Sequence, residues 1–94
     1  MTIIRMDTDP ELVFKRVHEF FGPDIQIKLS TRADKKYMLL NPQTNKWVHF
    51  GQKGYQDYTG HKNLMRREMF RRRNHKWAHA PIFSPAFLSF YFLW

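Results

Sequence analysis

The apolar residues of this chain are unusually rich in aromatic rings. The chain has 94 residues, among them nine Phe, four Tyr and three Trp, and it has no cysteine. A chain of this length forms one small domain, and aromatic side chains bury a large apolar area per residue. Disulfides and thiolate metal sites are excluded as further sources of stability. We therefore expect residues 1–94 to fold as a single domain around packed aromatic side chains.

The first predicted element is a helix over residues 10–21. Thr8 and Asp9 offer a capping side chain, and Pro10 suits the first helical turn. The Gly22-Pro23 pair ends the helix. Within it, apolar residues recur at helical spacing and define one face: Val13, Phe14, Val17, Phe20 and Phe21.

Three strands are predicted in the middle of the chain. Residues 25–29 alternate apolar and polar side chains, as a half-buried strand does. Residues 36–50 are predicted to form a β-hairpin, because two strand-like runs flank the Asn- and Pro-rich residues 41–45. Together with the helices, these strands predict an α+β fold, in which a small antiparallel sheet packs with two or three helices.

The last third of the chain begins with a second predicted helix, over residues 63–76, with Asn63 as its cap. Residues 77–83 are expected to be extended, because Pro81 ends any helix. Ser84 and Pro85 then repeat the combination of a capping residue and a proline. The apolar residues 86–94 that follow fit either a short helix or a buried strand, since their periodicity does not decide.

Positive charge is concentrated in the same third of the chain. The net charge is +8, to which residues 1–30 contribute −1, residues 31–60 contribute +3 and residues 61–94 contribute +6. Only Glu68 opposes the cations of a segment that we call the basic block, which consists of Lys62, Arg66, Arg67, Arg71, Arg72, Arg73 and Lys76. Such a concentration of cations is typical of a protein whose partner is rich in phosphate or carboxylate groups.

On a helix, the basic block would surround the axis. Arg67 and Arg71 share one side, Lys62, Arg66 and Arg73 lie on another, and Arg72 is apart from both. The pair Arg67–Arg71 repels itself by a few tenths of a kcal/mol unless a polyanion is bound.

The planar guanidinium group suits phosphate, so the basic block, with Lys53, is our candidate nucleic-acid-binding surface. Charge alone carries no base readout, so this binding would be directed to the backbone. An acidic protein surface is the alternative partner, and a merely solvated helix is the alternative without a partner.

Two other segments have a functional and a structural interpretation each. The loop from Phe50 to Tyr58 contains Gly51 and Gly54, which either approach phosphate beside a stacking tyrosine or form a tight turn whose tyrosines close the core. The C-terminal aromatic residues either cap the core or form an interface with a partner. The candidate interface residues are Phe87, Phe90, Tyr91 and Trp94.

Catalytic and metal-binding motifs are not found. His75 and His79 have a spacing of four but lack further ligands, and no nucleophile accompanies Asp57 and His61. We therefore predict no enzyme activity, no cofactor and no metal site. The N-terminal residues do not resemble a secretory signal, and the longest apolar run, residues 86–94, is too short to cross a membrane. We expect an intracellular protein.

An ordered series of motifs in residues 35–94 resembles a family of short basic proteins encoded by large nucleocytoplasmic DNA viruses of algae and protists. The series consists of Lys36-Tyr37-Met38-Leu39-Leu40-Asn41-Pro42, Lys46-Trp47-Val48-His49-Phe50-Gly51, Gly54-Tyr55-x-Asp57-Tyr58-Thr59-x-His61-Lys62, Arg66-Arg67-x-x-Phe70, and Trp77 followed by Ser84-Pro85, Leu88-Ser89 and Leu93-Trp94. The resemblance implies a setting, an infected cell or a virion, and transfers no catalytic residue. Residues 1–34 take no part in it.

These observations predict a non-enzymatic viral protein that binds nucleic acid without sequence specificity and that is also a candidate virion component. The alternative is a minor capsid or scaffold protein, whose aromatic C-terminus inserts between neighbours while its arginines contact acidic capsid surfaces.

Overall fold

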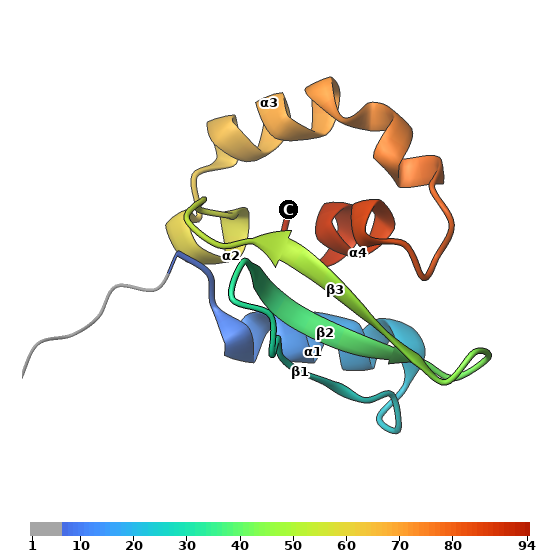
Figure 1. The fold of residues 1–94 in the computed structure, drawn as a ribbon. Helices are drawn as coiled ribbons and strands as arrows, with labels where there is room; N and C mark the ends of the chain where they lie inside the picture. Colours follow the sequence, from blue (N-terminus) through green and yellow to red (C-terminus); the bar gives the residue numbers. More distant parts are fainter. Residues whose placement is uncertain (1–6) are drawn as a thin grey trace, which may run out of the picture.

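Residues 7–94 are described in the computed structural model, and they form a three-stranded antiparallel sheet with helices packed against it (Figure 1). The predicted α+β fold is confirmed. The expectation that the chain lacks a secretory signal depends in part on residues 1–6, which lie outside the described residues. The elements are α1 (Pro10–Phe21), β1 (Ile27–Leu29), β2 (Lys35–Asn41), β3 (Lys46–Gln52), α2 (Tyr58–His61), α3 (Leu64–Arg73), the 3₁₀ helix η1 (His75–His79) and α4 (Pro85–Phe92).

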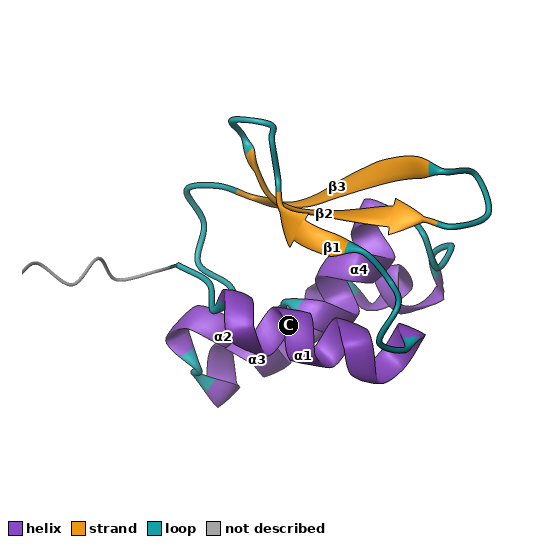
Figure 2. Cartoon of the chain, turned by 90° about the horizontal axis from the view of Figure 1, so that it is seen from below, coloured by secondary structure: helices purple, strands orange, loops and turns teal. Residues whose placement is uncertain are grey.

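The sheet has the order β1-β2-β3, with β2 and β3 forming the predicted hairpin. Leu39 of β2 lies between Ile27 of β1 and Val48 of β3. The hairpin turn closes through Asn45, which adopts the left-handed conformation at a φ of 58°. Figure 2 shows the helices gathered on one side of this sheet.

Helix α1 has the predicted bounds. The Asp9 carboxylate accepts a hydrogen bond from the Leu12 amide at 3.3 Å, and Pro10 occupies the first turn. At the other end, the Gly22 amide donates to the His18 carbonyl while Gly22 adopts a φ of 99°. The capping signals in the sequence are therefore the ones that the chain uses.

The C-terminal segment is a helix, which settles the choice between helix and strand. The Ser84 hydroxyl accepts a hydrogen bond from the Phe87 amide at 3.2 Å, and Pro85 begins α4. A capping residue followed by proline thus decided the structure where periodicity did not. None of the helices in residues 7–94 has both the length and the apolar character needed to span a bilayer.

The prediction of extended backbone from residue 77 is wrong for Trp77–His79, and the predicted helix over 63–76 is shorter than expected. Helix α3 ends at Arg73, and the Asn74 carbonyl accepts from the Trp77 amide at 2.9 Å to begin η1. Proline restricts its own φ and the residue before it. Pro81 therefore leaves residues up to His79 free to form a 3₁₀ turn.

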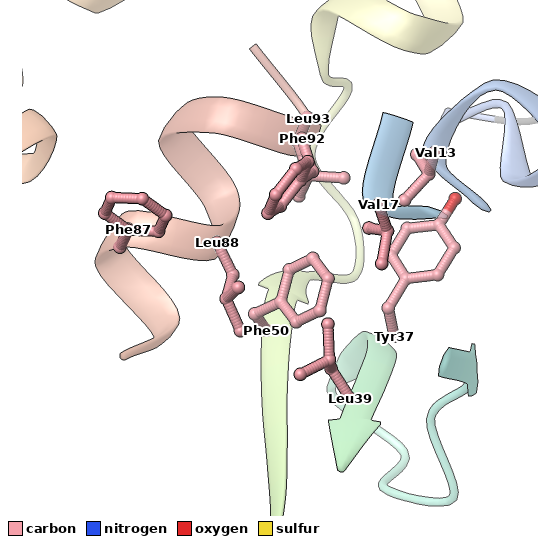
Figure 3. Close-up of a cluster of buried hydrophobic side chains, with 9 residues drawn as sticks. All are labelled: Val13, Val17, Tyr37, Leu39, Phe50, Phe87, Leu88, Phe92 and Leu93. Carbon is pink, nitrogen blue, oxygen red and sulfur yellow. The ribbon is translucent and has the colours of Figure 1, made fainter. Parts of the chain in front are cut away.

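Side chains from α1, β2, β3 and α4 meet in one core (Figure 3). Phe50 and Tyr37 pack at 5.7 Å between ring centroids, and both are fully buried. Four of the nine core residues are aromatic and the other five are Val or Leu. The core consists of Val13, Val17, Tyr37, Leu39, Phe50, Phe87, Leu88, Phe92 and Leu93.

A buried polar network fastens α2 to the sheet and to the start of α1. The Thr8 hydroxyl lies 2.7 Å from the Tyr37 hydroxyl and 3.1 Å from the Thr59 hydroxyl. Thr59 donates in turn to the Asp57 carboxylate, which also forms an ion pair with Lys36 at 3.1 Å. Burial raises the pKa of Tyr37 above its ordinary value, so its hydroxyl stays protonated in the network.

Gly60 is required by the close approach of this network to the N-terminal segment. A Cβ on Gly60 would overlap the Asp7 carbonyl and would lie 2.8 Å from the Thr8 amide nitrogen. Alanine normally stabilises a helical position relative to glycine by about 0.5–1 kcal/mol. At residue 60 we expect alanine to destabilise the protein relative to glycine.

We predict that Gly60→Ala lowers the free energy of unfolding by about 1–3 kcal/mol, because main-chain atoms must move to admit the methyl group. Urea denaturation of the variant and of the parent protein measures the difference. An unchanged or increased stability would contradict the tight contact between α2 and residues 7–8.

Candidate nucleic-acid interface

Helix α3 carries most of the basic block and has no buried residue. In Figure 1 it lies above α4 and the sheet, and it is connected to the body through α2 at one end and η1 at the other. The Asn63 side chain caps it as predicted, accepting from the Arg66 amide at 3.1 Å. The cations of α3 fall into three environments, which correspond to the three directions expected from helical geometry.

The first environment is a cleft between α3 and the body, with a volume of about 380 Å³. Arg66, Phe70, Arg73 and Trp77 line it from the side of α3 and η1. Arg66, Phe70 and Arg73 recur at intervals of four and three, which places them along one side of α3, and Trp77 continues the lining from η1. From the opposite side the cleft is lined by Gln52, Tyr55, Gln56, Ser89, Leu93 and Trp94, together with the Lys36–Asp57 pair.

Aromatic contacts hold the inner side of α3 over this cleft. Phe70 stacks on Trp94 at 4.0 Å with an interplanar angle of 5°, and the edge of one ring meets the face of the other between Phe70 and Trp77 at 5.6 Å. Phe70 is thus the point at which α3 rests on the C-terminal segment. The guanidinium groups of Arg66 and Arg73 lie on either side of it along the helix, and both side chains are exposed.

The second environment is formed by Arg67 and Arg71, which pack against the body. Arg67 donates from Nε to the Trp94 carbonyl at 2.9 Å and lies 5.0 Å from the centre of the Tyr58 ring. Arg71 lies 4.3 Å from the centre of the Phe90 ring. Both contacts are cation–π interactions on half-buried side chains.

Arg16 of α1 completes this second group and was not among the predicted site residues. It donates to the Phe92 carbonyl at 3.3 Å and lies 6.0 Å from the Tyr58 ring. Burial lowers the pKa of Arg16 and that of Arg71, and the charge of Arg67 lowers both further. Arg16 is separated from the basic block by some fifty residues, and only the fold brings it there.

The third environment is the outer side of α3 and the exposed cations beyond its ends. Arg72 pairs with Glu68 at 3.3 Å and Lys62 with Asp9 at 3.4 Å, and all four side chains are substantially exposed. Exposed pairs of this kind contribute about 0–1 kcal/mol and are readily exchanged for another anion. Lys53 and Lys76 are also exposed.

Within residues 7–94, these two pairs are the salt bridges formed by the basic block. The block contains seven cations and α3 a single acid, so most of its charge is not neutralised inside the molecule. Arg66 donates one hydrogen bond to the neutral side-chain amide of Gln56 at 2.8 Å. An anionic partner would therefore meet a surface that is already assembled and still positive.

The predicted interface at the C-terminus is largely core. Phe87 and Phe90 are buried, and Trp94 is half-buried against Phe70. Tyr91 is 37% exposed and donates its hydroxyl to the Ala78 carbonyl. Phe87 and Phe90 are covered in this conformation for different reasons: Phe87 packs in the core, and Phe90 lies beneath the guanidinium group of Arg71.

The glycine loop is a turn with one exposed ring. Gly54 lies in this turn with a φ of 92°, whereas Gly51, with a φ of 81°, belongs to β3. A Cβ on Gly51 would lie 3.0 Å from a methyl group of Leu93. Tyr58 is half-buried, but Tyr55 is 69% exposed and does not close the core.

The histidines form no metal site in the described part of the chain, where no group of three or more suitable ligands occurs. The rings of His75 and His79 lie 5.5 Å apart. His61 accepts from the Asn63 amide at Nδ1, while its buried Nε2 has no partner. Burial lowers the pKa of His61, and the charge of Arg66 lowers it further.

Comparison with known proteins identifies a family. Residues 25–77 match the model described as "Family of unknown function (DUF5754)", which is more than half of the chain. The chain belongs to this family. The DUF5754 match includes the whole sheet, α2 and α3, and it leaves out α1 and α4. No curated protein and no solved structure matches the chain. The viral setting implied by the sequence resemblance remains a prediction.

The floor of the cleft provides a test of what holds this DUF5754 chain together. Asp57 is 1% exposed and Lys36 is 8% exposed, so removing one partner leaves the other charge buried. We predict that Asp57→Leu lowers the free energy of unfolding by about 3–5 kcal/mol.

The double variant Lys36→Met with Asp57→Leu is expected to recover much of that loss, because it leaves no unpaired charge. Urea denaturation measures both variants. If the double variant is as unstable as Asp57→Leu, hydrogen bonding of Asp57 to Thr59 matters more than the ion pair does.

Proposed function

We propose that this protein binds nucleic acid, without catalysis and without sequence specificity, through phosphate contacts of the basic block. The observation that carries the proposal is the state of α3, a helix with no buried residue that holds exposed cations on two of its sides. A helix face that contributes little to the core and carries unneutralised charge is suited to an external anionic partner. Guanidinium groups at different heights along it suit successive phosphates.

The cations are expected to contribute to phosphate binding in three different ways. Arg66 and Arg73 would contact phosphates at the cleft, and Arg72 and Lys76 would do so on the outer side together with Lys53 and Lys62. Arg67 and Arg71 already stabilise the attachment of α3 to Tyr58 and Phe90. We therefore assign to these two a mainly structural part, with remaining N–H groups available to phosphate.

The setting that we propose is an infected cell, with the virion as a second location. It derives from the resemblance of residues 35–94 to short basic proteins of large DNA viruses. A large DNA genome would supply the polyanion, and no catalytic group is required for that association.

A protein partner is the second candidate, and one observation favours it. Leu64, Met65 and Met69 of α3 are between 51% and 69% exposed, and Met69 lies one turn before Arg72. Exposed apolar residues beside cations suit an acidic protein surface, such as a capsid or scaffold component. In this version of the capsid or scaffold hypothesis, the exposed apolar residues of α3 contact the partner in place of the C-terminal aromatic residues.

We predict that binding to duplex DNA weakens steeply as salt increases, with a log–log slope that loses about 0.9 for each phosphate contact removed. The variant that replaces Arg72, Arg73 and Lys76 with Gln should show a shallower slope and weaker binding. Fluorescence anisotropy with a labelled duplex at several salt concentrations measures both.

The matched control replaces Lys15, Lys28 and Lys46 with Gln, which removes the same charge from exposed positions on α1, β1 and β3. It should bind nearly as well as the parent protein. Equal losses in the two triple variants would show that total charge alone, and not α3, determines binding. No binding at low salt would reject the proposed function and favour the protein partner.

A further inference from the structure

We propose that the cleft beneath α3 receives an unpaired nucleotide, so that the protein prefers single-stranded over double-stranded nucleic acid. Arg66 and Arg73 would contact the phosphates, and the base would stack on Tyr55 or Trp77. This inference rests on the proposed function and goes further, because it names the form of nucleic acid and the site that selects it.

The cleft combines the two kinds of group that a nucleotide requires. Its volume of about 380 Å³ falls in the usual range of small-molecule sites, about 300–1,000 Å³. Cations line it at both ends of the inner side of α3, at Arg66 and Arg73. Single-strand-binding proteins use this same combination of a basic groove and aromatic platforms.

Two of the aromatic rings that line the cleft have surface to offer. Phe70 and Trp94 are stacked on each other at 4.0 Å, so each has one face occupied by the other. Trp77 meets Phe70 nearly at right angles, so the two rings do not stack face to face. Tyr55, on the opposite wall, is 69% exposed.

The exposed ring of Tyr55 has no evident role in stabilising the fold. Its side chain makes no hydrogen bond among those found in residues 7–94, and its main-chain carbonyl accepts from Lys36 and so fixes the residue at the cleft. The main chain is thus tied to the body by a hydrogen bond while the ring stays exposed. A large exposed ring beside cations is suited to stacking on a base.

The dimensions of the cleft favour a single strand. The bases of a duplex are stacked and paired, so a duplex would reach only the cations at the rim and on the outer side of α3. An unpaired base can turn into the cleft without first being separated from a partner. Stacking of one base changes affinity by about fivefold to a hundredfold, which is the size of preference that we expect.

The test uses the full chain and four labelled probes of equal length: an oligothymidylate, an oligouridylate, a strand of abasic sugar-phosphate units, and a duplex. The abasic strand keeps the phosphates and removes the bases. We expect both base-containing single strands to bind at least about fivefold more tightly than the abasic strand. Oligothymidylate and oligouridylate distinguish DNA from RNA as the source of the nucleotide.

Neighbouring arginines provide a matched pair of variants. Arg73→Gln removes one charge from the cleft, and Arg72→Gln removes one from an exposed side chain of α3 that does not line the cleft. Arg72→Gln should weaken binding to the oligothymidylate and to the duplex by a similar factor. Arg73→Gln should weaken binding to the oligothymidylate more than binding to the duplex.

Tyr55 provides a test of stacking that does not threaten the fold. Tyr55→Ala should bring the affinity for oligothymidylate to within about threefold of that for the abasic strand. Tyr55→Phe keeps the ring and should preserve the preference. Thermal unfolding of each variant verifies that stability is unaltered, as expected for a side chain this exposed.

The outcomes separate this inference from the proposed function. Equal affinity for abasic and base-containing strands, or equal effects of Arg72→Gln and Arg73→Gln on the two probes, would overturn the cleft as a nucleotide site. Duplex binding with a steep salt dependence would then still support the phosphate contacts. Absence of binding to all four probes would overturn both.

Discussion

The buried ion pair between Lys36 and Asp57 is the interaction on which the arrangement of this molecule depends. Its carboxylate also accepts from Thr59, whose hydroxyl is joined to Thr8 and through it to Tyr37. These contacts link a strand, the N-terminal segment and the short helix α2, which is too short to be stable alone. Helix α3 follows α2 directly, so the network determines where the cation-bearing helix begins.

The other support of α3 is aromatic. Phe70 rests on Trp94, which follows α4, and Arg67 and Arg71 lie over the rings of Tyr58 and Phe90. The helix is therefore attached along one edge and at its ends, while Arg66 and Arg73 line a cleft and Arg72 points outward. A helix supported in this way retains exposed cations that a core helix would have to neutralise. This is the physical basis for assigning it an anionic partner.

Much of the fold follows from local signals in the sequence. Asp9 with Pro10 begins α1 and Gly22 ends it where they were expected to. Ser84 with Pro85 begins α4, in a segment for which the sequence had left helix and strand open. Helix α2 was not predicted because four residues show no periodicity. The 3₁₀ turn at Trp77 was not predicted, because Pro81 was expected to keep the backbone extended from residue 77 onward. Proline restricts only its own conformation and that of the residue before it.

The candidate site was only partly predictable. The spacing of Arg66, Phe70 and Arg73 along one side of the predicted helix was available from the sequence. The place of Trp77 was not, because the predicted helix ended at residue 76 and extended backbone was expected beyond it. Arg16 had no such signal, since its place beside Arg67 depends on long-range packing. The assignment of Phe87 and Phe90 to an interface could not be tested by composition, because core and interface favour the same residues.

The central claim is that α3 and the loop at Tyr55 form the surface that meets the polyanion. Amide hydrogen exchange of the full chain, followed with and without a short oligothymidylate at low salt, tests it most directly. Exchange should slow in Leu64–Arg73 and in residues 53–57, and it should be unchanged in the hairpin turn at residues 42–45. Slowing confined to the sheet or the hairpin turn, with α3 unchanged while the oligonucleotide is bound, would contradict the account.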